Sequence, residues 1–106
     1  MKRLIAIAAL ALLSMAPAMS RAGMITLTQG STKVKGYLAL PSGEGTHPAI
    51  VVIHERWGLN DWVKRTADRF AAQGFRVLAP DLYRGKVATN PETAHELMRG
   101  LPDERA

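Results

Sequence analysis

The feature that most constrains the fold is a strand–helix–strand succession in the middle of the chain. Residues 49–53, AIVVI, are apolar at every position, which is typical of a strand buried on both faces inside a parallel sheet. Asn60 can cap a helix over residues 61–73, and residues 75–79, FRVLA, form a second strand that Pro80 ends. Strands joined by a crossover helix pair in parallel, so this segment predicts an α/β fold.

The crossover helix carries its apolar side chains on one face, together with Thr66. At helical spacing the apolar ones are Trp62, Val63, Ala67, Phe70 and Ala71. Gly74 stands where a left-handed glycine commonly ends a helix. One helix covers one face of a sheet, whereas a strand as apolar as residues 49–53 needs cover on both faces. We therefore expect the sheet formed by these residues to be incomplete.

Further elements are expected on either side of this unit. Residues 24–29 alternate apolar and polar side chains, and after a Gly-Ser turn residues 34–40 continue, which predicts an antiparallel hairpin. Residues 89–92, TNPE, fit a capping box with Thr89 as the N-cap of a second helix. The apolar stripe of that helix comprises Ala94, Leu97, Met98 and Leu101. Residues 103–106 are typical of the acidic first turn of another helix.

Residues 1–22 have the pattern of a secretory signal peptide. A basic pair precedes the apolar run 4–13, which is too short for a membrane span of about 20 residues. Small residues offer one cleavage site after Ala22 and a second after Ala18. A buried core helix is the alternative, but it would show a polar stripe. We expect an exported protein, periplasmic or secreted, whose domain comprises residues 23–106.

The charge balance restricts the partner classes. The chain has 14 Lys and Arg against 9 Asp and Glu, a net charge of +5. Three of the basic residues lie within the signal pattern, so the remainder carries 14 minus 3, or 11, basic residues against 9, a net +2. No basic stripe with interleaved aromatic residues is present, so nucleic-acid binding is not expected. Nor do we expect membrane association after cleavage, or disulfides in a chain without cysteine.

Functional residues are expected in the loop after residues 49–53, because ligands of open α/β sheets gather at the carboxyl ends of the strands. The loop contains His54, Glu55, Arg56 and Trp57, directly before a helix N-terminus, whose free N–H groups favour an anion. A partly buried Glu55 would have to be paired, hydrogen-bonded or protonated. The alternative to a functional role for Glu55 is a carboxylate bonded to loop amides or to Arg56. For His54, a packed, hydrogen-bonded position is favoured over a catalytic base. Trp57 is interpreted as core or pocket wall.

The loop after the second strand, residues 81–85 (DLYRG), is expected at the same sheet edge. Arg84 is a candidate for holding a substrate carboxylate through two hydrogen bonds, and Trp57 is the other candidate substrate-binding residue. An ordinary salt bridge, for instance to Asp81, is the alternative for Arg84. The sequence contains no metal-ligand cluster and no phosphate-binding glycine loop, and no cofactor is expected.

Three short motifs suggest a family. They are HExxG(L/V)N at residues 54–60, ADRxAxxG at 67–74 and APDLY at 79–83. Within residues 47–98, about half of the chain, the sequence resembles the dienelactone hydrolase family of α/β-hydrolases. The segment GKVAT at 85–89 is similar to a subgroup of that family in which another helix follows.

The resemblance implies the N-terminal part of an α/β-hydrolase sheet and the hydrolysis of an enol-lactone or related ester. It implies a cysteine nucleophile completed by an aspartate and a histidine, all following the region present here. Glu55 matches the family glutamate that contacts the resting thiol, and the backbone N–H of Arg56 matches one oxyanion-hole donor. This chain departs from the family in having a charged residue at position 56. Arg84 also follows DLY directly, whereas the family's substrate-binding arginine follows after one residue.

The chain itself contains no complete triad. It has no cysteine, Ser31 and Ser42 precede the central strand, and His95 lies in a predicted helix without a serine or acid arranged beside it. We therefore expect a partial hydrolase domain that is inactive alone and whose full-length form acts on small lactones or esters. The alternative is a non-catalytic exported small binding module, which should close its sheet within these residues.

Overall fold

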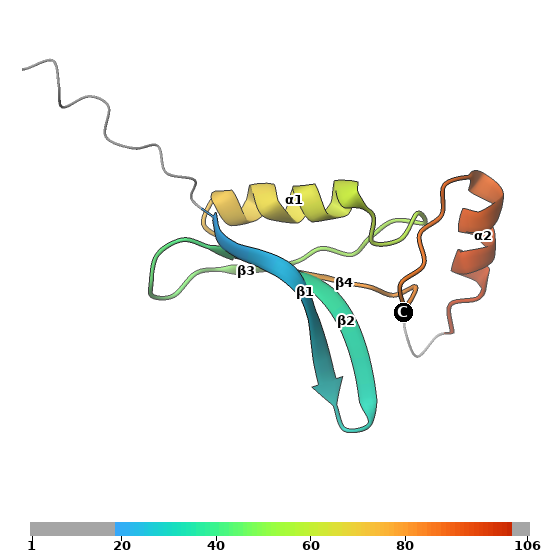
Figure 1. The fold of residues 1–106 in the computed structure, drawn as a ribbon, viewed down its shortest axis with the longest axis horizontal. Helices are drawn as coiled ribbons and strands as arrows, with labels where there is room; N and C mark the ends of the chain where they lie inside the picture. Colours follow the sequence, from blue (N-terminus) through green and yellow to red (C-terminus); the bar gives the residue numbers. More distant parts are fainter. Residues whose placement is uncertain (1–18, 103–106) are drawn as a thin grey trace, which may run out of the picture.

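The computed structural model describes residues 19–102, which form one four-stranded sheet and two helices (Figure 1). The strand order is β1-β2-β4-β3. The first two strands form an antiparallel pair, and the last two pair in parallel. This mixed sheet confirms the predicted fold class, an antiparallel hairpin followed by a parallel βαβ unit.

The hairpin is longer than the sequence pattern indicated. It consists of β1 (Met19–Gln29) and β2 (Thr32–Pro41), joined by a two-residue turn in which Gly30 has a left-handed φ of +59°. Residues 19–22, which the sequence pattern assigns to the signal peptide, are the first residues of β1 and lie opposite the end of β2. Figure 1 shows the hairpin tip reaching away from the rest of the sheet.

The predicted βαβ unit is confirmed. It comprises β3 (Ala49–Val51), α1 (Asp61–Ala72) and β4 (Arg76–Pro80). Asn60 is the N-cap of α1, and its side-chain oxygen accepts a hydrogen bond of 3.0 Å from the N–H of Val63. On its other edge β4 pairs antiparallel with β2, so it joins the hairpin to the parallel pair.

α1 covers one face of the sheet and completes the core. Four small side chains are fully buried there: Ala39, Ala67, Ala71 and Val77. The predicted apolar face of the helix is wider than the part that the sheet buries, because Trp62 is 56% exposed and Phe70 is 39% exposed. Of these two rings, Phe70 meets Phe75 edge to face.

A polar contact also fastens α1 to the sheet. The hydroxyl of Tyr37 on β2 donates a hydrogen bond of 2.7 Å to a carboxylate oxygen of Asp68. Burial, this hydrogen bond and the negative charge of Asp68 together raise the pKa of Tyr37 to about 12. The neutral phenol is therefore the form that the folded chain holds at physiological pH.

The prediction that residues 49–53 are buried on both faces is wrong. Val51 and Ile53 are each 60% exposed, whereas Val52 packs against the core below α1. Successive side chains along a strand point to opposite faces, so a single helix buries only alternate ones. Within residues 19–102 α1 is the only helix that packs on the sheet, and no described helix covers the opposite face of the sheet.

The second helix, α2 (Pro91–Arg99), is capped differently from the prediction. Its N-cap is Asn90 rather than Thr89, and the Asn90 side chain accepts a hydrogen bond of 2.8 Å from the N–H of Thr93. Asparagine is at least as good an N-cap as threonine. This start also places the proline at the first helical position, where its missing N–H costs nothing.

α2 stands beside the sheet and packs on the loop after β4, not on another element (Figure 1). Of its predicted apolar stripe, Ala94 is fully buried and Met98 is 48% exposed. The described residues include no helix that is both long and apolar enough to cross a bilayer. Most of the predicted signal peptide, residues 1–18, and the predicted last helical turn, residues 103–106, lie outside the described part of the chain.

Candidate active site

The two loops that the sequence singled out lie together at the carboxyl ends of β3 and β4. Because these strands are parallel neighbours, both loops leave the sheet at the same edge. Two hydrogen bonds tie the loops to each other: the N–H of Leu82 donates to Nε2 of His54 at 3.1 Å, and the N–H of Ala88 donates to the carbonyl of Trp57 at 2.9 Å. The expected juxtaposition of the two loops is therefore present.

His54 is a structural cross-link in this arrangement. Its ring is buried and meets the ring of Tyr83 edge to face, with 4.8 Å between centroids. Because Nε2 accepts from Leu82, the ring proton belongs on Nδ1, which lies 2.7 Å from the carbonyl oxygen of Glu55 and donates to it. Both ring nitrogens are engaged, in agreement with the packed, hydrogen-bonded role favoured over a catalytic base.

A tight turn follows His54. The N–H of Gly58 donates to the carbonyl of Glu55 at 3.1 Å, which places Arg56 and Trp57 at its centre. Gly58 has a φ of +92°, and a Cβ at this residue would lie 2.6 Å from the carbonyl oxygen of Lys86. The turn therefore requires glycine for both its conformation and its packing. The HExxG motif places Gly58 at the end of this loop, but its close approach to Lys86, 28 residues later, is visible only in the fold.

The turn presents two groups without partners in the described chain. The side chain of Glu55 is exposed, and no group within residues 19–102 donates a hydrogen bond or forms an ion pair with its carboxylate. The N–H of Arg56 likewise has no acceptor there, while its guanidinium lies over the Trp57 ring, 4.8 Å from the centroid. Glu55 is exposed rather than partly buried, so it does not need a partner, and the alternative of a carboxylate bonded to loop amides or to Arg56 is not found within residues 19–102.

The loop after β4 is shaped by Asp81. Its buried carboxylate accepts hydrogen bonds from the N–H of Tyr83 at 3.1 Å and from the N–H of Gly85 at 2.6 Å. The alternative of a salt bridge from Asp81 to Arg84 is not found: both carboxylate oxygens bond backbone amides. Arg84 itself has a φ of +51°, a left-handed conformation that few residues other than glycine adopt.

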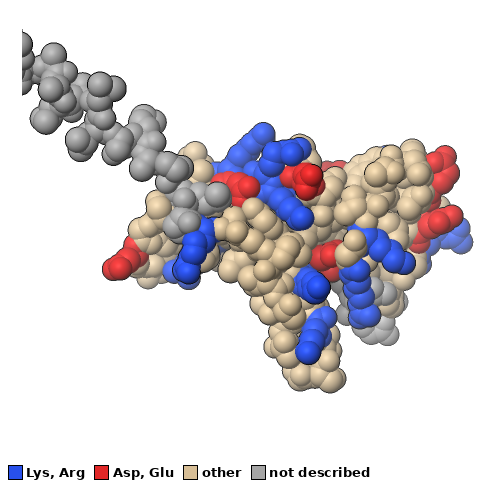
Figure 2. Space-filling model, in the orientation of Figure 1, with Lys and Arg blue, Asp and Glu red and all other residues tan. Residues whose placement is uncertain are grey.

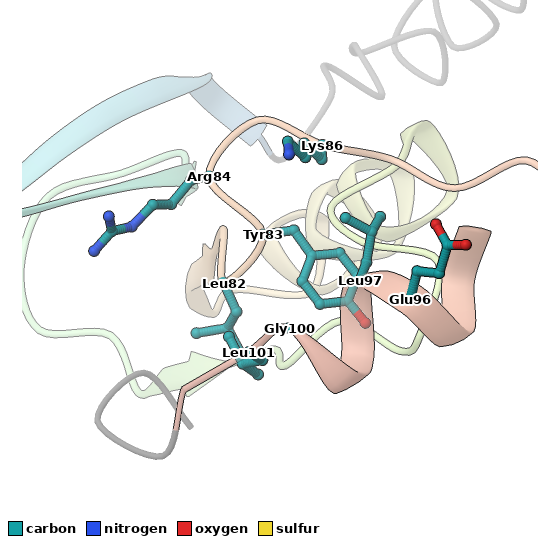
Figure 3. A pocket seen from close by; sticks show the side chains of 8 residues that line it. All are labelled: Leu82, Tyr83, Arg84, Lys86, Glu96, Leu97, Gly100 and Leu101. Atoms are coloured by element: carbon teal, nitrogen blue, oxygen red, sulfur yellow. The ribbon is translucent and has the colours of Figure 1, made fainter. Parts of the chain in front are cut away.

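Arg84 lies apart from the turn that holds Glu55. It lines two cavities, one of about 450 Å³ against α2 and one of about 780 Å³ against the hairpin, and Glu55 lines neither. In the first cavity the Arg84 side chain points away from Tyr83, Leu97 and Glu96 (Figure 3). The described residues thus bring the two loops together, but neither of these two cavities reaches Glu55.

The triad residues are not present in the described chain, and neither serine substitutes for a nucleophile. Ser31 lies in the hairpin turn and Ser42 in the loop after β2, both exposed. His95 is exposed on α2. Within residues 19–102 no three His, Asp or Glu side chains come together as a group that could hold a metal ion.

Comparisons with known proteins agree with this geometry. The family model described as "Dienelactone hydrolase family" matches residues 34–106. Over 85 residues the chain is 42% identical to protein usf of Aquifex pyrophilus and 39% identical to a protein of Aquifex aeolicus (strain VF5) provisionally named carboxymethylenebutenolidase. Each alignment covers 77% of this chain and 36% of the relative, so the chain spans little more than a third of their length.

A solved structure titled "m3DLH" superposes with a TM-score of 0.67 at 34% sequence identity. The superposition covers 83% of this chain and 37% of that structure. The mixed sheet and its flanking helices are thus part of a larger fold in that structure.

Proposed function

This chain belongs to the dienelactone hydrolase family, and we propose on that premise that the protein hydrolyses lactone or ester bonds in small molecules, in the manner of a carboxymethylenebutenolidase. The observation that carries the proposal is the turn after β3. There the N–H of Arg56 and the carboxylate of Glu55, both without partners in residues 19–102, stand together at the carboxyl edge of the sheet.

Arg56 would act through its backbone. When a nucleophile adds to an ester carbonyl, the carbonyl oxygen gains negative charge, and a fixed N–H donor lowers that barrier by about 3 kcal/mol. The N–H of Arg56 sits at the centre of a turn fixed by Gly58 and has no other acceptor among the described residues. The guanidinium is held over Trp57, so a charged side chain does not interfere with the amide.

Glu55 would control the nucleophile. We place the reactive cysteine in polypeptide other than residues 1–106, which contain none, next to this carboxylate. A neighbouring negative charge determines how much of a thiol is present as the more nucleophilic thiolate. The exposed Glu55 carboxylate, with no partner in residues 19–102, is available for that contact. The half-buried Trp57 beside it would form one wall of the substrate pocket.

The first test is the DNA downstream of codon 106. An in-frame continuation that contains G-x-C-x-G supports the hydrolase proposal. A stop codon without such a motif nearby contradicts it and favours the alternative, a non-catalytic exported small binding module.

In a protein that contains that continuation, Glu55→Gln is expected to lower kcat/KM for p-nitrophenyl acetate by about 100-fold and to alter its pH profile. Glu44→Gln is the matched control, because Glu44 is an equally exposed glutamate in the loop after β2. An unchanged pH profile in Glu55→Gln, with full activity, would contradict the role of Glu55.

We further propose that residues 1–106 alone do not hydrolyse esters, because they include no cysteine and no serine at a strand-to-helix elbow. Purified 106-residue chain should hydrolyse p-nitrophenyl acetate no faster than buffer. The proposal would be overturned if the chain hydrolyses the ester faster than buffer and the Ser31→Ala/Ser42→Ala double variant does not.

We also propose that the protein is exported, on the basis of the basic pair and apolar run in residues 1–22. Of the two cleavage sites, the one after Ala18 is favoured by the pairing of β1. Cleavage after Ala22 would remove four residues of that strand, and with them the partners of Leu40 and Ala39 on β2. N-terminal sequencing of the mature protein should give Met19. An uncleaved cytoplasmic chain would contradict export.

A further inference from the structure

We propose that the cavity between the β1–β2 hairpin and the loop after β4 binds the phosphate group of a small phosphate monoester. We call it the hairpin cavity. Residues that line it include Thr26, Lys33, Lys35, Asp81 and Arg84. Its volume of about 780 Å³ lies within the range of small-molecule sites. Glu55 and Arg56 do not line it, so this inference goes beyond the proposed hydrolase site.

The hairpin cavity holds an excess of positive charge. Three of its side chains are cations, Lys33, Lys35 and Arg84, and none of them forms an ion pair within the described chain. The single carboxylate, Asp81, is buried, and its two oxygens already accept hydrogen bonds from backbone amides of its own loop. Figure 2 shows Lys and Arg side chains on both the hairpin and the neighbouring surface across the hollow between them.

The hairpin fixes the placement of its cations. Lys33 and Lys35 are two residues apart on β2, so both side chains stand on the same face, about 7 Å apart along the strand. Thr26 lies directly opposite Lys35 in the antiparallel register, which adds a hydroxyl beside that ammonium group. Two cations and a hydroxyl donor therefore line one wall of the cavity.

Arg84 supplies the opposite wall. The hydrogen bonds from the N–H groups of Tyr83 and Gly85 to the Asp81 carboxylate hold this loop, and Arg84 between them takes a left-handed φ of +51°. This backbone conformation is unfavourable for residues other than glycine and persists only where the surrounding structure imposes it. Figure 3 shows the side chain directed away from α2, and the guanidinium shares the hairpin cavity with the two lysines.

This donor set selects the ligand chemistry. A guanidinium binds two oxygens of one oxyanion in a fixed plane, and ammonium groups add point charges around it. Three cations suit a dianion such as a phosphate monoester above its second pKa of about 6 better than a single carboxylate. The cavity is much larger than one phosphate group, so an organic substituent is expected. No aromatic side chain lines it for base stacking, which disfavours single-stranded nucleic acid.

The test is isothermal titration of the 106-residue chain, kept below the concentration at which light scattering shows association, at low ionic strength and pH 7.5, with phenyl phosphate, inorganic phosphate and benzoate as probes. We expect phenyl phosphate to bind more tightly than either of the other two. No measurable phenyl phosphate binding, or equal binding of benzoate, would overturn the proposal. Equal binding of inorganic phosphate would overturn the assignment to a monoester.

Charge-removing variants locate the site. Lys33→Gln, Lys35→Gln and Arg84→Gln should each weaken phenyl phosphate binding about threefold to tenfold. Arg84→Gly serves as a second variant, because glycine accepts the left-handed φ and keeps the loop folded. Lys64→Gln on α1 is the control, since it removes the same charge outside the cavity. If Lys64→Gln weakens binding as much as the cavity variants do, binding reflects net charge and the proposal fails.

Discussion

Gly58 occupies the tightest place in the candidate site. Its φ of +92° is strained for any other residue, and a Cβ would lie 2.6 Å from the carbonyl oxygen of Lys86. A backbone oxygen cannot move aside as the end of a flexible side chain can. The turn that presents Glu55 and Arg56 depends on this one residue.

We therefore expect Gly58→Ala to destabilise the fold by well over about 1 kcal/mol, the cost of a left-handed φ alone. Gly74→Ala is the matched control: Gly74 has a φ of +98°, but a Cβ there would meet nothing within 4 Å. Urea unfolding followed by Trp fluorescence measures both variants in dilute solution. Equal losses of unfolding free energy would show that the contact with Lys86 is unimportant.

Tyr37 makes the second residue-scale prediction, which concerns pH. Burial, the hydrogen bond to Asp68 and the charge of Asp68 raise its pKa to about 12 from an ordinary value near 10. Between pH 10 and 12 the Tyr37 hydroxyl is therefore protonated in the folded state and ionised in the unfolded state. The stability from this contact is complete below pH 10 and is lost as the pH rises through 12.

The measurement is a phenolate absorbance titration of the folded chain. One tyrosine should ionise near pH 12 in the wild-type protein, and Asp68→Asn should move that transition toward 10 because it removes the carboxylate charge. The stability difference between the two proteins should shrink over the same interval. A wild-type titration with no transition near pH 12 would show that the contact does not persist in solution.

At the scale of elements, the two helices have similar caps but different surroundings. Asn60 caps α1, which packs on three strands, and Asn90 caps α2, which packs on none. The cap bonds are alike in kind and length, 3.0 Å and 2.8 Å. The effect of losing an N-cap on global stability therefore depends on whether the capped helix packs on the sheet.

We expect Asn60→Ala to lower the free energy of global unfolding by about 1 kcal/mol. Asn90→Ala should leave global unfolding unchanged and increase hydrogen exchange only within α2. Amide exchange monitored by mass spectrometry, alongside urea unfolding, distinguishes the two responses. A global loss in Asn90→Ala equal to that in Asn60→Ala would contradict the separation of α2 from the core.

At the scale of the whole molecule, the sheet formed by residues 19–102 has one face covered by α1 and one face that no described helix covers, called here the bare face. Val51 and Ile53 expose apolar side chains on the bare face, and among the described strands β3 pairs on one edge only. An unpaired strand edge beside apolar surface is a template for association. This apolar surface is exposed because side chains along a strand alternate between the two faces of the sheet, and α1 covers only one of them.

The 106-residue chain alone should therefore be poorly soluble and should associate as its concentration rises. Val51→Lys, which places a charge on the bare face, should raise the concentration at which light scattering begins. Val87→Lys is the control, because Val87 is also exposed but lies in the loop after β4. A monodisperse wild-type monomer that melts cooperatively would contradict this expectation.

The sequence by itself determined the local elements and their order. Asn60 and Gly74 bounded α1, alternation and the Gly-Ser turn indicated the hairpin, and the apolar segments on either side of α1 paired in parallel as expected. Such features depend on a residue and its near neighbours in the chain. The placement of Glu55 and Arg56 at the strand end followed from the same local order, together with the general behaviour of parallel strands.

Only the tertiary structure decided which side chains are buried and which are engaged. The composition of residues 49–53 could not reveal that Val51 faces solvent, because burial depends on whether another element covers that face. Likewise His54 is engaged by Leu82, 28 residues later, and Asp81 bonds amides of its own loop rather than Arg84. A sequence pattern specifies local conformation, whereas hydrogen-bond partners and burial depend on segments that meet only when the chain folds.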